Sequence, residues 1–117
     1  MYEYRATVAR VVDGDTYELE VDLGLRVQTR TRVRLRGVDT PETYGVRRGS
    51  AEWTRGRAAK DFVVAWFAAH GPEFVIRTFR DRTGKFGRWL VEVEDLDRGV
   101  RLSEALLDAG HAVTVDW

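Results

Sequence analysis

Two short segments of the chain gather carboxylates that could act together. Asp13-Gly14-Asp15-Thr16 is a tight turn that carries two of them. In the second segment Asp39 follows Arg34 by five residues, and Glu42 follows Asp39 by three. The carboxylates of the two segments could converge on one cation.

Calcium suits such a group of ligands. Ca²⁺ binds several oxygen atoms and mixes carboxylates with backbone carbonyls and water. Asp15, Asp39 and the Thr40 carbonyl are therefore a candidate partial shell. Pro41 has no N–H and favours extended backbone at Thr40, which leaves that carbonyl free to turn toward a ligand. For Asp13 the sequence favours a plainer role, that of a turn residue whose carboxylate hydrogen-bonds its own backbone.

Basic residues are clustered although the net charge is zero, with 19 basic and 19 acidic residues. Residues 26–57 hold nine arginines and three acidic residues, a local charge of +6. Residues 77–88 hold five basic residues and one aspartate, a local charge of +4. Seventeen of the 19 basic residues are arginines, whose planar fork binds phosphate with two hydrogen bonds. The clusters point to a polyanionic partner, while a GC-rich genome could explain the arginine excess alone.

Composition excludes several classes of protein. A chain of 117 residues with 44% apolar and 32% charged residues is expected to form one globular domain, residues 1–117. Cysteine is absent, which excludes disulfides, thiolate zinc sites and a cysteine nucleophile. No apolar run could span a bilayer, and no signal peptide is visible. The expectation is a cytoplasmic monomer that binds no membrane, with secretion left open.

The periodicity of apolar residues predicts the elements that must position these groups. Strands are expected at residues 6–12, 16–23 and 30–38, the last with an arginine at every second position. An amphipathic helix over 50–69 precedes strands at 74–79 and 88–94, and Ser103 is expected to cap a second helix. This order predicts a β-rich α+β fold, a five-stranded OB-type barrel with two flanking helices.

Four motifs in this order resemble those of the staphylococcal nuclease-like family, the thermonuclease homologues. They are Val12 to Thr16, Arg34 to Glu42, Lys85 to Arg88, and Leu102 to Leu106 followed by Gly110. The resemblance covers nearly the whole chain. It implies an OB barrel with flanking helices and calcium-dependent hydrolysis of DNA and RNA.

The resemblance also implies roles for single residues around a metal ion. Asp15 and Asp39 correspond to the calcium carboxylates, and the Thr40 carbonyl to a further ligand. Glu42 corresponds to the glutamate that acts on the attacking water. Such roles agree with the chemistry, because a divalent ion neutralises charge that grows on phosphate oxygens and a nearby carboxylate orients the water.

On the substrate side, Arg34 and Arg88 resemble the two arginines that clamp the phosphate. Lys85 resembles a lysine near the terminal phosphate of the nucleotide. Phe86 stands where nucleases of the family often have tyrosine, so a hydroxyl is lost and a ring remains for stacking.

Other positions depart from the family pattern or stay outside the expected site. Asp116 stands where a base-stacking tyrosine is expected, and Trp117 is the tryptophan that could serve as a base platform. The hairpin at residues 22–29 is expected to be longer than in the prototype. His70 and His111 are expected to be structural and remote from the site.

Together these residues predict a calcium-dependent nuclease that acts on exposed strands of DNA or RNA. The alternative is a noncatalytic OB-fold module that binds nucleic acid or protein. The joint presence of Arg34, Asp39, Glu42 and Arg88 favours the nuclease, because a module that has lost its metal site has no reason to keep all four.

Overall fold

The computed structural model describes residues 1–43, 45–80 and 89–117. Along the chain its elements are β1 (Tyr2–Asp13), β2 (Thr16–Asp22), β3 (Gln28–Leu35), β4 (Val38–Asp39), α1 (Ala51–Ala69), β5 (Glu73–Arg80), β6 (Trp89–Asp95), α2 (Leu102–Asp108) and β7 (Val113–Thr114). The order of the long elements agrees with the sequence prediction. The sequence pattern does not predict β4 and β7, which have two residues each and pair with one another.

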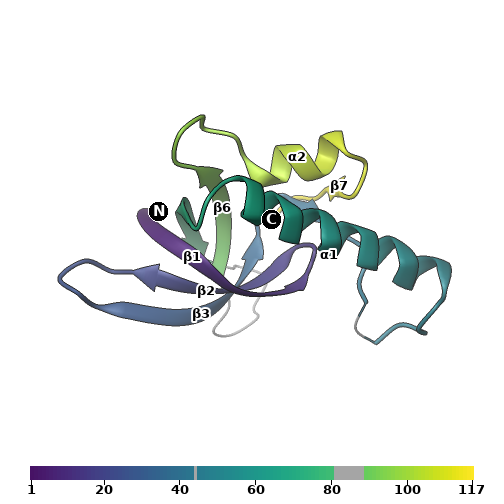
Figure 1. The fold of residues 1–117 in the computed structure, drawn as a ribbon. Coiled ribbons are helices and arrows are strands. Elements are labelled where there is room, and N and C mark those ends of the chain that lie inside the picture. The colour runs from purple at the N-terminus through teal and green to yellow at the C-terminus, as the bar shows by residue number, and fades with distance from the viewer. Residues whose placement is uncertain (44, 81–88) are drawn as a thin grey trace.

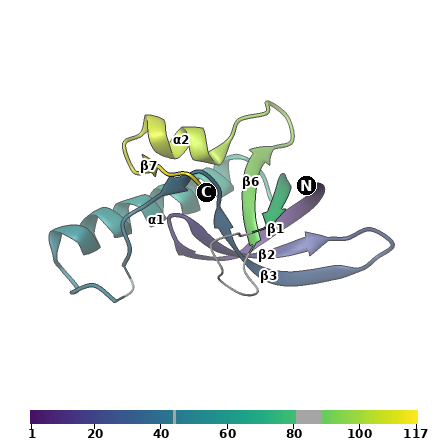
Figure 2. The same ribbon diagram turned by 180° about the vertical axis from the view of Figure 1, so that it is seen from behind.

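Five strands form a closed barrel in the order β1-β2-β3-β6-β5. Neighbouring strands are antiparallel except for β3 and β6, which run parallel. Both helices pack on the same side of the barrel, as Figure 1 shows from the front and Figure 2 from behind. The predicted OB-type barrel with two flanking helices is confirmed.

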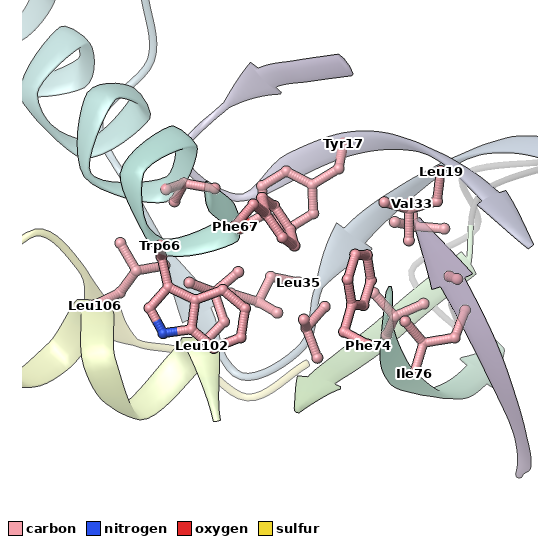
Figure 3. Close-up of a cluster of buried hydrophobic side chains, with 14 of the residues drawn as sticks. Tyr17, Leu19, Val33, Leu35, Trp66, Phe67, Phe74, Ile76, Leu102 and Leu106 are labelled. Atoms are coloured by element: carbon pink, nitrogen blue, oxygen red, sulfur yellow. The ribbon is translucent and has the colours of Figure 1, made fainter. Parts of the chain in front are cut away.

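One hydrophobic core joins the barrel to the helices. On β2 every second residue is buried, namely Tyr17, Leu19 and Val21, as the predicted alternation requires. The ring of Tyr17 meets Phe67 of α1 edge-on, with 5.5 Å between ring centroids. Figure 3 shows aromatic side chains of α1 packed between the barrel and α2. Helix α1 therefore covers one opening of the barrel, beside the turn between β1 and β2.

Helix α1 begins and ends where the sequence indicates. The Ser50 hydroxyl accepts a hydrogen bond from the Trp53 amide at 3.2 Å, and Gly71 follows the helix in the left-handed region, with φ of 87°. In the described parts of the chain, neither helix combines the length and apolar character that a membrane span requires.

The prediction that Ser103 caps α2 is wrong. The cap position is occupied by Arg101, whose side chain makes no capping hydrogen bond. Arg101 forms an isolated β-bridge with Glu94, and the Asp95 amide donates to the carbonyl of Val100 at 3.0 Å. Because these bonds hold the chain against β6, it turns into the helix two residues earlier than the serine suggests.

His70 has the structural role that the sequence predicts. Its Nδ1 lies 2.8 Å from Oδ2 of Asp95, and its ring stacks on Trp66. Burial of the Asp95 carboxyl raises its pKa, but hydrogen bonds from His70 and from the Val100 and Arg98 amides lower it more, so the pKa lies below the ordinary value. The pair fastens the end of α1 to the turn that follows β6.

Beyond the barrel, β2 and β3 continue as a two-stranded arm (Figures 1 and 2). Gly24, Leu25 and Arg26 at its tip all have positive φ, and Leu25 is 98% exposed. The hairpin predicted at residues 22–29 is therefore present.

Helix α1 also packs against the segment that follows β4. A Cβ added to Gly56 would lie 2.7 Å from the Glu42 carbonyl oxygen and 2.8 Å from that of Pro41. Only glycine allows the helix to approach this backbone so closely. The position of the Glu42 backbone therefore depends on a residue in the middle of α1.

Gly56→Ala is expected to destabilise the protein, although alanine is normally the better helix former by about 1 kcal/mol. The added methyl group overpacks the contact with the Glu42 carbonyl, at a cost of about 1–3 kcal/mol. Urea denaturation measures the change. Ala58→Gly, on the exposed face of the same helix, reports the helix propensity alone, and a gain in stability from Gly56→Ala would contradict the tight contact.

Candidate functional site

The turn between β1 and β2 carries the first group of candidate residues. The Tyr17 hydroxyl donates to the Gly14 carbonyl at 2.5 Å, and the Leu35 amide donates to the Asp15 carbonyl at 2.8 Å. A Cβ on Gly14 would lie 2.8 Å from Oγ1 of Thr40 and 2.9 Å from the Cβ of Ala59. The turn is thus pressed between β3, α1 and the chain after β4, which places Asp15 inside the molecule.

Arg34 links the two aspartates that the sequence predicts as ligands. Its Nη2 lies 3.2 Å from Oδ2 of Asp15 and 2.7 Å from Oδ1 of Asp39. The Asp15 side chain is 5% exposed, that of Arg34 11% and that of Asp39 46%. Two carboxylates therefore converge on one positive group at the edge of the core.

Burial governs the electrostatics of Asp15. Loss of water raises the pKa of its carboxyl, while the Arg34 guanidinium and hydrogen bonds from the Thr40 amide and the Thr16 hydroxyl lower it. Burial has the larger effect, so the pKa lies above the ordinary value for aspartate. Arg34 therefore offsets only part of the effect that burial has on the Asp15 carboxyl.

The segment after β4 brings Thr40 to the aspartates and leaves Glu42 exposed. The Thr40 amide donates to Oδ2 of Asp15 at 3.2 Å, and the buried Oγ1 of Thr40 has no hydrogen-bond partner among the described residues. Within residues 1–43, 45–80 and 89–117, no three acidic or histidine side chains are close enough to hold one metal ion. The structure therefore joins Asp15, Asp39 and Thr40, and it does not add Glu42 to them.

The Arg34 guanidinium also lies near the C-terminal tryptophan. Its Cζ lies 5.2 Å from the ring centroid of Trp117, and the Trp117 carbonyl accepts a hydrogen bond from the Gly37 amide. The Nε of Arg34 is buried and has no acceptor among the described residues. One donor of the guanidinium thus remains for another acceptor.

Arg30 and Arg32 of β3, and Arg36 directly after this strand, do not form an uncompensated row of positive charge. Acidic residues of neighbouring strands pair with each of them: Arg30 with Glu20 at 2.6 Å, Arg32 with Glu18 at 3.0 Å, and Arg36 with Glu92 at 3.3 Å. The alternating arginines that the sequence singles out on this strand are therefore matched by acidic residues across the sheet. Within the row, Arg34 alone has the two candidate ligands as partners.

Three predicted residues, Lys85, Phe86 and Arg88, lie outside the described residues. Their roles stay predictions.

Two residues that the sequence sets aside belong to the site region. Asp13 does not bond its own backbone as predicted: its Oδ1 accepts from the Thr43 amide at 3.3 Å and from the Thr43 hydroxyl at 2.8 Å. His111 is not remote from the site as predicted, because it lines a cleft of about 600 Å³ together with Asp39, Glu42 and Arg55. Gly110 precedes His111 in the left-handed region that ends α2, a conformation that turns the chain back toward α1.

Fold and site define an OB-type barrel with a buried arginine held between two aspartates at one end. No family model matches the chain. The chain is similar to endonuclease YhcR of Bacillus subtilis (strain 168), with 30% identity over 115 residues. The match covers 96% of this chain and 9% of YhcR, so the chain spans a small part of that relative.

Arg34→Met is expected to destabilise the protein by about 3–5 kcal/mol near pH 7, because Asp15 keeps a buried charge without its partner. The loss of stability in Arg34→Met is expected to be smaller at pH 4. Burial makes the folded Asp15 bind its proton more tightly than the unfolded residue, whose pKa is about 3.9. The cost of the buried charge therefore appears as the pH rises and Asp15 ionises. It disappears as the pH falls and Asp15 takes up its proton. Urea denaturation at both pH values measures it.

Arg32→Met is the matched control for this comparison. It removes an arginine from the same strand, but the pair with Glu18 is more exposed and contributes up to about 1 kcal/mol. Equal losses for the two variants, or a loss for Arg34→Met that does not depend on pH, would contradict the electrostatic role of Arg34.

Proposed function

We propose that this protein is a calcium-dependent nuclease similar to the staphylococcal nuclease-like family. It hydrolyses phosphodiester bonds of DNA, with RNA as a second substrate class. The observation that carries the proposal is the meeting of Asp15 and Asp39 at a single cationic nitrogen of Arg34. The similarity to an endonuclease over almost the whole chain supports the same function.

The residues present fit a calcium ion. Two carboxylates carry two negative charges and face a single positive group, so the cluster can accept a further cation. Asp15, Asp39 and the Thr40 carbonyl would hold the ion, with water as the remaining ligands. When bound, it would supply positive charge beside the phosphate and stabilise the charge that develops on the phosphate oxygens.

Residues of the chain supply the other parts of the reaction. Arg34 donates from the fork to a nonbridging oxygen of the phosphate, and its Nε has no competing acceptor among the described residues. Glu42, exposed at the cleft, accepts a proton from a water whose oxygen bonds to phosphorus. The bond from phosphorus to the leaving oxygen breaks, and that oxygen takes a proton from solvent. Arg88 is the second proposed clamp.

A noncatalytic OB-fold module that binds nucleic acid or protein is the second candidate. One observation favours it: Arg34 already pairs with both aspartates, so a side chain of the protein holds the two carboxylates together without a metal ion. The two functions differ in what calcium does. Calcium is required for cleavage by the nuclease and has no effect on such a module.

Cleavage of single-stranded DNA is expected with millimolar calcium and none with excess chelator, as measured on a gel. Magnesium should substitute poorly, because it requires strict octahedral geometry and releases its waters reluctantly. Asp39→Asn is expected to lower kcat by about 100-fold or more, because a calcium ion that has lost a carboxylate ligand would stabilise less of the charge that develops on the phosphate. Asp22→Asn, at an exposed turn aspartate that accepts the Gly24 amide, should have no effect. DNA binding without cleavage at any calcium concentration would support the noncatalytic module instead.

Single strands and frayed duplexes are expected to be cut faster than stable duplex. In-line attack needs a flexible backbone, and bases that are free of pairing can stack on an aromatic side chain such as Trp117. A DNA hairpin with a GC-rich stem provides both substrates in one molecule, so cleavage sites are compared directly. Equal cleavage in stem and loop would contradict this preference.

A further inference from the structure

Asp13 and Thr43 lie 30 residues apart in the sequence and are joined by two hydrogen bonds. Asp13 is 8% exposed, and one of its oxygens accepts both the amide and the hydroxyl of Thr43. Among the described residues no cationic side chain pairs with Asp13. The Asp13 carboxylate therefore bonds the loop that contains Glu42.

The turn that carries Asp13 holds this loop at two points. Asp15 accepts the Thr40 amide at 3.2 Å, two residues before Glu42, and Asp13 accepts Thr43 one residue after it. Gly56 of α1 packs directly behind the Glu42 carbonyl. The Glu42 backbone is thus fixed from both sides while its side chain remains exposed.

We propose that Asp13 is a positioning residue that fixes the place of the Glu42 carboxylate by holding Thr43. The inference rests on the proposed function, in which Glu42 acts on the attacking water. A cleft of about 390 Å³ lined by Asp13, Thr16, Arg32 and Glu42 leaves room in which the Glu42 side chain could otherwise turn away from the substrate. Displacement of a catalytic group by about 1 Å can lower a rate by about 100-fold.

The positioning role of Asp13 depends on an acceptor oxygen and not on its charge. Asparagine and alanine at this position therefore test the two properties separately. Asparagine keeps one side-chain carbonyl oxygen that can accept both Thr43 donors, whereas alanine keeps none. Asp13→Ala is expected to lower kcat on single-stranded DNA with calcium by about 10- to 100-fold with little change in KM. Asp13→Asn should keep most of the activity. Asp22→Ala is the matched control, because Asp22 also accepts a backbone amide in a turn, but far from the site.

A double-mutant cycle shows whether Asp13 acts through Glu42. In a Glu42→Gln background, Asp13→Ala is expected to cause no further loss of kcat, because the group that it positions is already disabled. The same loss in both backgrounds would overturn the proposal. So would weaker calcium binding by Asp13→Asn in a calcium titration, since that would make Asp13 a metal ligand.

A measurement without substrate separates this inference from the proposed function. Amide hydrogen exchange of Thr43, followed by NMR, should be fast in Asp13→Ala and slow in the wild type and in Asp13→Asn. Slow exchange in Asp13→Ala would overturn the positioning role even in an active enzyme. If the protein never cleaves DNA but shows the expected exchange pattern, Asp13 does hold the loop. The nuclease proposal would then be overturned, and the contact would have no catalytic role.

Discussion

The buried carboxylate of Asp15 is the constraint on which the rest of the site depends. A charge at this depth needs opposite charge and hydrogen bonds, and it receives them from Arg34, Thr16 and Thr40. Each of these partners comes from a different part of the chain: Thr16 from the start of β2, Arg34 from the end of β3, and Thr40 from the segment directly after β4. The ion pair and hydrogen bonds of the Asp15 carboxylate therefore bring together the segments that carry the candidate site. Burial raises the pKa of Asp15 more than these partners lower it.

Close backbone approach is the second requirement of this arrangement. Gly14 and Gly56 lie where a methyl group would meet Thr40 and Glu42, and so the turn and α1 can enclose the loop between β4 and α1 from two sides. The barrel supplies rigidity, because β1, β2 and β3 are paired along most of their length. Exposed Glu42 is consequently attached to a backbone that has little freedom, a useful property for a group that must meet a substrate in one orientation.

Much of the fold could be predicted from the sequence, and less of the site. Strict alternation in β2 and the 3.6-residue period of α1 are local signals, so barrel and helix are found without tertiary information. The pairing of Arg30 and Arg32 with Glu20 and Glu18 depends on the register between strands, which local patterns do not reveal. For the same reason the sequence predicts a bond of Asp13 within its own turn, although its partner Thr43 lies 30 residues away. Gly56 is a sequence signal for part of the site, because a glycine inside α1 weakens the helix and indicates a close packing contact.

The aspartates of the candidate site and their partners also lie within a short stretch of the chain. Asp13, Asp15, Arg34, Asp39 and Thr43 all fall within residues 13–43, in the meander of β1, β2 and β3 and the segment that follows it. Loops between such residues are short, so the entropy lost in bringing them together is small. Closure of the barrel requires β6 to join β3 in parallel, a pairing between residues 56 positions apart. We therefore expect the Asp15–Arg34 pair to form early in folding and the closed barrel to form around it, since local contacts form faster than distant ones.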